Sequence, residues 1–205
     1  PEHWLKYLGL RVSKEEVAGD IMLCVLFFFI AKGLILVSLP DGYDLVIGYD
    51  GWGYLVLITT LFQALNEELV FRGLVIQLLL YWKVKHWVII VVPGIVFSLL
   101  HWFFYKYSFS NNHNGILDFP SLITLAMFGA SAGMIYLRAR NVLMPWALHM
   151  AWNFNRFSLI RTDEPYKEIN EASTFNLLEG APSIVALSFV LLLVSYLFYK
   201  ERKSV

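Results

Sequence analysis

The sequence predicts an all-α fold, a polytopic transmembrane helical bundle of about six spans with a polar site near mid-membrane. The chain has 205 residues, of which 58% are hydrophobic and 16% are charged, and its mean hydropathy is +0.60. Soluble domains carry about 25% charged residues, so this composition indicates an integral membrane protein. Several apolar stretches reach the roughly 20 residues that a helix needs to cross a bilayer, and some contain ionisable residues.

Residues 1–19 form a polar segment that precedes the apolar stretches. Trp4, Leu8 and Val12 fall on one face of a helix over residues 3–19, and basic residues lie beside that face. This pattern predicts either an interfacial helix or a frayed polar tail. The sequence contains no internal repeat or flexible linker, so we expect residues 1–205 to be a single integral membrane domain.

Six apolar segments follow, and each is a candidate span. The second has 30 residues and would be ~45 Å long against a hydrocarbon core of ~30 Å, so it must tilt or protrude. It ends at Tyr81, Trp82 and Lys83, a combination typical of an interfacial anchor. Cys24, in the first segment, is the only cysteine and is expected to pack as a small apolar side chain. The expected spans are residues 21–39, 53–82, 87–104, 120–137, 141–160 and 181–199.

The basic residues predict the orientation of these spans. If six spans alternate in direction, ten Lys and Arg residues fall on one side and four on the other. Because basic loops favour the cytoplasmic side, both termini are predicted to be cytoplasmic in a multi-pass membrane protein. The formal net charge is zero and no basic run indicates a nucleic-acid partner, so the lipid bilayer is the expected environment. The ten residues are Lys6, Arg11, Lys14, Lys83, Lys85, Arg138, Arg140, Lys200, Arg202 and Lys203.

Glu67, Glu68 and Arg72 lie in the middle of the second span. Ionisable groups at bilayer depth are unfavourable, so they usually face a bundle interior or a wet cavity. Glu68 and Arg72 are four residues apart and can pair along one helix face, whereas Glu67 is rotated by about 100°. Two carboxylates exceed the charge that one arginine balances. This favours a general base with a supporting carboxylate over an ion-pair network that only fixes packing.

His101 and His149 lie in the third and fifth expected spans. Counting ~1.5 Å per residue from the cytoplasmic ends puts Glu67 and His101 at ~21–22 Å and His149 with Asn153 at ~10–17 Å, compatible with one site. Glu67, His101 and His149 form a donor set that suits a catalytic Zn²⁺ with one open position. The same groups also suit a metal-free mechanism. In that case Glu67 and His101 polarise water, and His149 with Asn153 stabilises an oxyanion.

Residues 129–133 read Gly-Ala-Ser-Ala-Gly, which matches the nucleophile-elbow pattern around Ser131. That pattern requires a turn from a strand into a helix, and this apolar segment does not offer one. Gly129 and Gly133 also form a GxxxG pair, which lets transmembrane helices approach closely. Helix packing is therefore the favoured interpretation. A serine protease that uses Ser131 and His149 is a distant alternative.

Together these motifs resemble the family of CAAX prenyl proteases and bacteriocin-processing enzymes, intramembrane proteases also called the Abi family. The family pattern is Glu-Glu-x-x-x-Arg, then Phe-x-x-x-His, then His-x-x-x-Asn. In this chain it is matched by residues 67–72, by Phe97 with His101, and by His149 with Asn153. The resemblance covers roughly residues 60–155, the expected catalytic core.

The resemblance implies an intramembrane endopeptidase, a hydrolase of metalloprotease type that cleaves CAAX-type prenylated or other membrane-associated peptides. It implies that Glu67 activates water with help from His101. His149 and Asn153 would then bind the oxyanion or a zinc ion, while Glu68 and Arg72 brace the site. The small size is typical of prokaryotic members.

The alternative is a non-enzymatic membrane protein, either a bacteriocin self-immunity factor or a proton-coupled transporter that uses the same residues as a relay. Transporters usually contain inverted repeats or paired broken helices, and this sequence shows neither, which favours the protease. Its expected partner is a peptide or membrane-protein substrate. The sequence does not indicate the oligomeric state.

Overall fold

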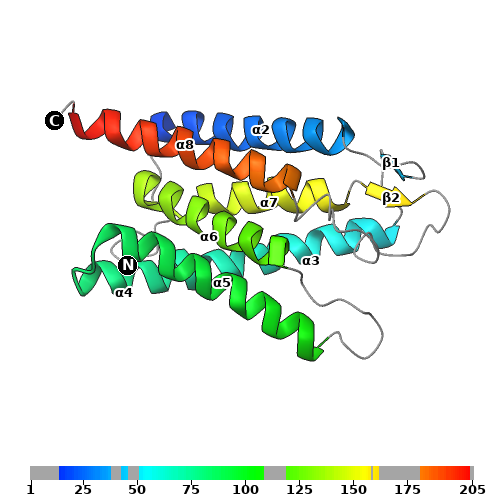
Figure 1. Ribbon diagram of the computed structural model, residues 1–205, viewed down its shortest axis with the longest axis horizontal. Coiled ribbons are helices and arrows are strands. Elements are labelled where there is room, and N and C mark those ends of the chain that lie inside the picture. Colours follow the sequence, from blue (N-terminus) through cyan, green and yellow to red (C-terminus); the bar gives the residue numbers. More distant parts are fainter. Residues whose placement is uncertain are drawn as a thin grey trace.

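The computed structural model describes residues 14–37, 43–45, 51–108, 119–157, 159–161 and 181–203. They form a bundle of long helices that run side by side, with neighbours along the chain alternating in direction (Figure 1). The prediction of a helical bundle is confirmed, and the described residues add one short two-stranded ribbon. The helices are α2 (Lys14–Val37), α3 (Gly51–Glu68), the π-helix η1 (Leu69–Ile76), α4 (Gln77–Tyr81), α5 (His86–Ser108), α6 (Phe119–Ala139), α7 (Leu143–Phe157) and α8 (Ala181–Lys203).

Each expected span corresponds to a helix at nearly its predicted place. The second expected span is one continuous run of α3, η1 and α4. The fifth was predicted too long, because α7 ends at Phe157 and the following strand β2 (Leu159–Arg161) pairs antiparallel with β1 (Tyr43–Leu45). This pairing gives the backbone groups of β1 and β2 hydrogen-bond partners where the chain is not helical. Residues 3–13 of the predicted interfacial helix lie outside the described residues, and residues 14–19 belong to α2.

Two helices in the described part of the chain are long and apolar enough to cross a membrane. They are His86–Phe104 of α5 and Phe119–Ala139 of α6, and shorter apolar stretches occupy Cys24–Leu34 of α2 and Ile184–Tyr196 of α8. Six complete crossings and a site at mid-membrane therefore stay predictions.

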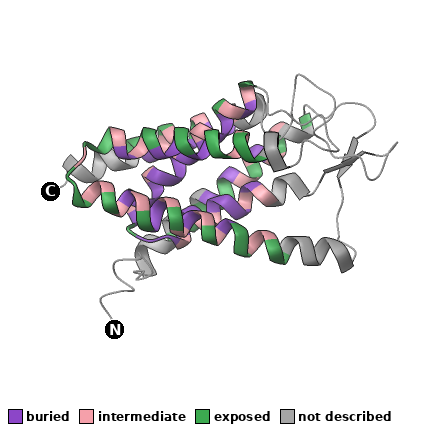
Figure 2. Cartoon of the chain, turned by 90° about the horizontal axis from the view of Figure 1, so that it is seen from below, coloured by how far each residue is buried: buried purple, intermediate pink, exposed green. Residues whose placement is uncertain are grey.

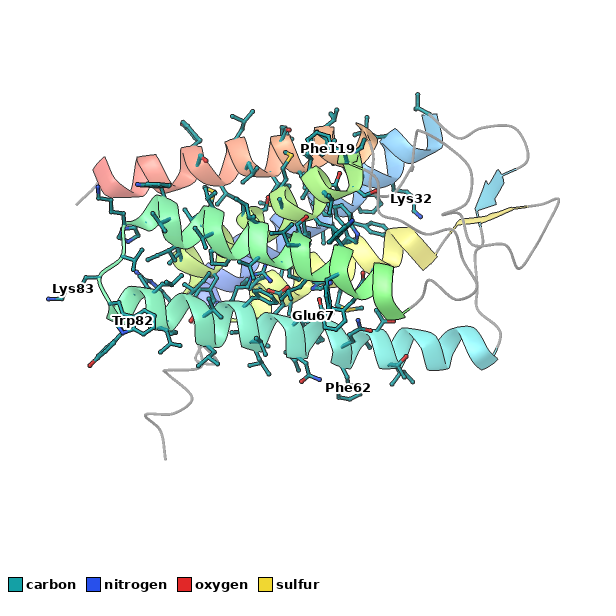
Figure 3. All side chains as sticks on the ribbon, turned by 60° about the horizontal axis from the view of Figure 1, so that its bottom comes forward. Lys32, Phe62, Glu67, Trp82, Lys83 and Phe119 are labelled. Atoms are coloured by element: carbon teal, nitrogen blue, oxygen red, sulfur yellow. The ribbon has the colours of Figure 1, made fainter. Side chains whose placement is uncertain are left out.

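The alternating directions of the helices gather the basic turns at one end of the bundle. The start of α2, the α4–α5 turn, the α6–α7 turn and the end of α8 all lie there (Figure 1). Figure 3 shows Trp82 and Lys83 at this end. Lys83 and Arg140 adopt left-handed backbone conformations, with φ of 56° and 53°, and so close the two short turns. The cytoplasmic location of this end stays a prediction.

The core lies around α6, which packs against α5, α7 and α8. Buried residues lie on the inner faces of the helices (Figure 2), and many residues of α5 are exposed. Phe27 of α2 stacks on Trp152 of α7, with ring centroids 6.1 Å apart. Cys24 is 5% exposed within this core, as predicted for a small apolar side chain.

Helices α5 and α6 meet backbone to backbone at two glycines. A Cβ atom added at Gly129 would lie 2.6 Å from the Cα atom of Gly94, a distance that real structures do not tolerate. The predicted packing role of Gly129 is therefore confirmed, and its partner is Gly94 of α5. At Gly133 an added Cβ would lie 3.6 Å from Cδ1 of Ile76, which is an ordinary contact. The GxxxG pair thus has one critical member and one more tolerant member.

Candidate active site

The site begins where α3 passes into the π-helix η1. Glu67 and Glu68 are the last two residues of α3, and Arg72 lies within η1. Turns of π-helix are rare and occur frequently at functional sites, and nothing in the sequence pattern predicted this one. Figure 3 shows Glu67 near the middle of the length of the bundle, whereas Phe62 of the same helix points outward.

Glu68 and Arg72 form a fully buried ion pair, with their side chains 0% and 1% exposed. Nη1 of Arg72 donates to Oε1 of Glu68 at 3.1 Å and lies 3.0 Å from Oε2. Nη2 of Arg72 donates to the backbone carbonyl of Gly129 on α6, also at 3.1 Å. The ring of Phe97 lies 5.3 Å from the guanidinium carbon, a cation–π contact. The predicted pairing along one helix face is confirmed, and it also ties η1 to α6.

His149 connects the two glutamates. Its Nδ1 lies 2.9 Å from Oε1 of Glu68, and because an ionised carboxylate only accepts, Nδ1–H is the donor. Its Nε2 points to the other glutamate, 3.9 Å from Oε2 of Glu67. Phe128 of α6 packs edge-on against the imidazole, with centroids 4.9 Å apart, and so limits its rotation.

His101, on α5, is also oriented by a hydrogen bond at its Nδ1. Its Nδ1 lies 2.9 Å from the backbone oxygen of Phe97, and a carbonyl oxygen accepts, so Nδ1–H again is the donor. In the neutral ring the lone pair is then on Nε2, which lies 3.8 Å from Oε2 of Glu67. The Phe97 ring packs against this imidazole, with centroids 4.3 Å apart. The Phe-x-x-x-His spacing therefore provides both the hydrogen-bond acceptor and the packing surface for His101.

Glu67 presents its two carboxylate oxygens to different surroundings. Oε1 accepts a hydrogen bond of 3.1 Å from Nε2 of Gln63, one turn earlier on α3. Oε2 is buried and has no hydrogen-bond partner in the described part of the chain, although it faces Nε2 of both histidines. At 3.8 and 3.9 Å these contacts exceed hydrogen-bond length. Three electron-rich atoms thus surround a gap that suits a proton donor or a cation.

Asn153 lies one turn beyond His149 on α7 and is half-buried. Within the described ranges, no hydrogen bond or ion pair joins it to the other five predicted site residues. The residue count placed His149 and Glu67 at depths compatible with one site, and their side chains do approach each other, with Nε2 of His149 3.9 Å from Oε2 of Glu67. The site also includes Gln63 and Phe128, which the sequence analysis did not identify. Only Gln63 could have been found from the sequence, by its spacing of four residues from Glu67.

The residues fit a zinc ion by their chemistry. Two imidazole nitrogens and one carboxylate oxygen are suitable donors, and each imidazole is oriented through its other nitrogen, as in many metal sites. The donor atoms of a tetrahedral zinc ion lie about 3.3 Å apart, so Glu67, His101 and His149 would have to close in slightly. Among the described residues, no group of three His, Cys, Asp or Glu side chains is already spaced for a metal ion.

Ser131 is fully buried in α6, and its hydroxyl donates to the backbone oxygen of Met127 at 2.8 Å. This bond within its own helix is the one expected for a packing residue. The geometry therefore favours packing over a nucleophilic role for Ser131.

Comparison with known families gives a match over the middle of this chain. A family described as type II CAAX prenyl endopeptidase, Rce1-like, matches residues 50–155. The matched range is just over half of the 205 residues, and it contains all six predicted site residues. Comparisons with curated proteins and with solved structures return no match.

Proposed function

The chain belongs to the Rce1-like family of type II CAAX prenyl endopeptidases, and from this premise we propose that it hydrolyses peptide bonds with water activated by Glu67 and His101. Membership confirms the family predicted from the motifs and makes the chain a membrane-embedded protease. The observation that supports the mechanism is the buried, unpartnered Oε2 of Glu67, 3.8 and 3.9 Å from the two imidazole nitrogens.

In the proposed reaction, a water molecule in this gap donates hydrogen bonds to Oε2 of Glu67 and Nε2 of His101. Glu67 takes one proton as the water oxygen bonds to the scissile carbonyl carbon. The tetrahedral intermediate then collapses, the C–N bond breaks, and Glu67 returns the proton to the leaving amine. Glu68 and Arg72 do not take part in proton transfer. They hold His149 and the end of α3 in position.

The oxyanion of that intermediate requires hydrogen-bond donors. We assign this role to Asn153 and to His149 in its doubly protonated form. An imidazolium at His149 would donate Nδ1–H to Glu68, 2.9 Å away, and Nε2–H to the oxyanion.

In the metal-assisted version, Glu67, His101 and neutral His149 would hold a zinc ion through Oε2 and the two Nε2 atoms. When bound, the ion would supply Lewis acidity and lower the pKa of a bound water molecule. Metal analysis of purified protein separates the two versions. The zinc version expects about one equivalent of zinc, loss of activity with a strong chelator and recovery on zinc addition. Metal-free protein that cleaves peptides contradicts it.

We propose that the substrates are CAAX-type prenylated or other membrane-associated peptides. The test is cleavage of a peptide library that includes prenylated C-terminal sequences, with wild type and Glu67→Ala compared in the same detergent or vesicles. Wild type should cleave at least one peptide that Glu67→Ala does not. A self-immunity factor or a proton-coupled transporter would cleave none, and equal cleavage by both proteins would contradict the assignment of Glu67.

We also propose that the chain lies in a prokaryotic cell membrane with both termini cytoplasmic. The proposed orientation is supported by the basic turns, which share one end of the bundle.

A further inference from the structure

Gln63 contacts the proposed general base from outside the matched motif residues. It lies four residues before Glu67 on α3, and its Nε2 donates to Oε1 of Glu67 at 3.1 Å. Gln63 is exposed, and neither the Glu-Glu-x-x-x-Arg motif nor the histidine motifs include it. We infer that Gln63 is a positioning residue for the proposed hydrolysis, holding the Glu67 carboxylate so that Oε2 faces the two imidazoles. This inference rests on the proposed function.

The physical need arises because the carboxylate of a glutamate turns easily. The last torsion of a Glu side chain is broad and roughly two-fold, so backbone position alone does not decide which oxygen points inward. In the described part of the chain, Gln63 supplies the only hydrogen bond to Glu67. A hydrogen bond to Oε1 fixes the orientation of the carboxylate, so that Oε2 points toward Nε2 of both imidazoles.

A comparison with the neighbouring Glu68 shows which restraints the Glu67 carboxylate would lack without Gln63. Glu68 is buried and contacts both Arg72 of η1 and Nδ1 of His149 on α7, so two elements besides its own helix restrict it. Glu67 is 22% exposed, and on its inner side Oε2 has no hydrogen-bond partner among the described residues. Its orientation therefore depends on the exposed side, where Gln63 is one helical turn away.

Because Gln63 is exposed, its effect on catalysis can be measured without a large effect on folding. Surface substitutions usually change stability by less than about 0.5 kcal/mol, so replacing Gln63 should leave the bundle intact. Gln63→Met keeps the length of the side chain and removes the donor. Asn66→Ala is the matched control, because Asn66 is also exposed and lies next to Glu67 on the same helix.

The experiment measures kcat, KM and the melting temperature of the full chain, using a peptide that wild type cleaves. We expect kcat of Gln63→Met to fall about 10-fold, the effect of losing one hydrogen bond to a charged group. KM and the melting temperature should stay at their wild-type values, because neither folding nor ground-state binding depends on Oε1. Asn66→Ala should match wild type.

Each other outcome has a definite meaning. Wild-type kcat in Gln63→Met overturns the inference while the proposed function stands. A lower melting temperature in Gln63→Met that accompanies its loss of activity points to a structural role and also overturns it. Wild type that cleaves no peptide, or Glu67→Ala that cleaves equally well, overturns the proposed function and this inference with it.

Discussion

The two halves of the site, built around adjacent glutamates, differ in how deeply they are buried and in how many helices their side chains connect. In the braced half, Glu68 and Arg72 are 0% and 1% exposed, and their contacts reach His149 and the backbone of Gly129. In the open half, Glu67 and His101 are 22% and 27% exposed, and Oε2 of Glu67 has no hydrogen-bond partner in the described residues.

The difference indicates how a membrane protein can retain a reactive carboxylate. A buried polar atom without a partner is unfavourable, so it persists only where the surrounding structure fixes it. The braced half supplies that rigidity, since it joins η1, α6 and α7 through one guanidinium and one carboxylate. We therefore expect changes in the open half to reduce rate and changes in the braced half to reduce stability.

The strongest test of this division is Glu67→Gln. We expect kcat to fall by about 10²–10⁴-fold, because an amide cannot accept the proton from water. The melting temperature should change little, since the amide keeps the shape of the side chain and an oxygen for Gln63. Peptide cleavage and thermal unfolding are measured on the same preparation. Full activity in this variant would show that Glu67 is not the general base.

Arg72→Ala should instead lower the stability of the protein. It leaves Glu68 as a buried carboxylate without its guanidinium, and removing one partner of such a pair costs about 3–5 kcal/mol. Equilibrium unfolding in detergent measures the loss. Adding Glu68→Ala should recover much of it, because the unpaired charge is then removed. A double variant no more stable than Arg72→Ala would show that the ion pair does not account for the loss.

Gly129→Ala tests the crossing that supports the braced half. The new Cβ would lie 2.6 Å from Cα of Gly94, so α5 and α6 must separate, and overpacking of this kind costs about 1–3 kcal/mol. Gly133→Ala is the matched control on the same helix, because its Cβ would make only an ordinary contact of 3.6 Å with Ile76. Unfolding free energies of the two variants are compared. Equal stability would show that the glycine crossing is not critical.

Ser131→Ala should have the smallest effect. It removes one hydroxyl that bonds to Met127 of its own helix, and polar contacts in membrane helices average about 0.6 kcal/mol. Activity should persist, and a fluorophosphonate probe should not label the wild-type protein. A folded Ser131→Ala protein without activity would instead support a serine nucleophile.

Much of the fold was predictable because apolar length identifies long helices. The sequence could not reveal the ribbon of β1 and β2, since three-residue strands carry too little pattern and pair across distant parts of the chain. The helix-to-π transition at Leu69 was also unpredictable. Its sequence is as apolar as the α-helices around it, and the sequence pattern gives no signal for the change.

The predictable part of the site is local. Glu68 and Arg72 pair because four residues make one helical turn, and the same rule places Phe97 beneath His101. Contacts between helices depend on rotation and height, which residues elsewhere decide. The hydrogen bonds from His149 to Glu68 and from Arg72 to Gly129 are of this kind. The role of Asn153 stays a prediction.

The π-helix η1 also constrains the number of residues between α3 and α4. Hydrogen bonds in η1 span five residues where an α-helix spans four, so each residue of Leu69–Ile76 turns the chain by a smaller angle. If the same eight residues returned to α-helix without a deletion, α4 would rotate relative to α3 by the angle of one residue, about 100°. Deleting one residue at the same time would offset that rotation, so Gln77 and the turn after Tyr81 would keep their directions. The number of residues between Glu68 and that turn is therefore coupled to the helix type of η1, because the π-helix holds about one residue more than an α-helix of the same total rotation.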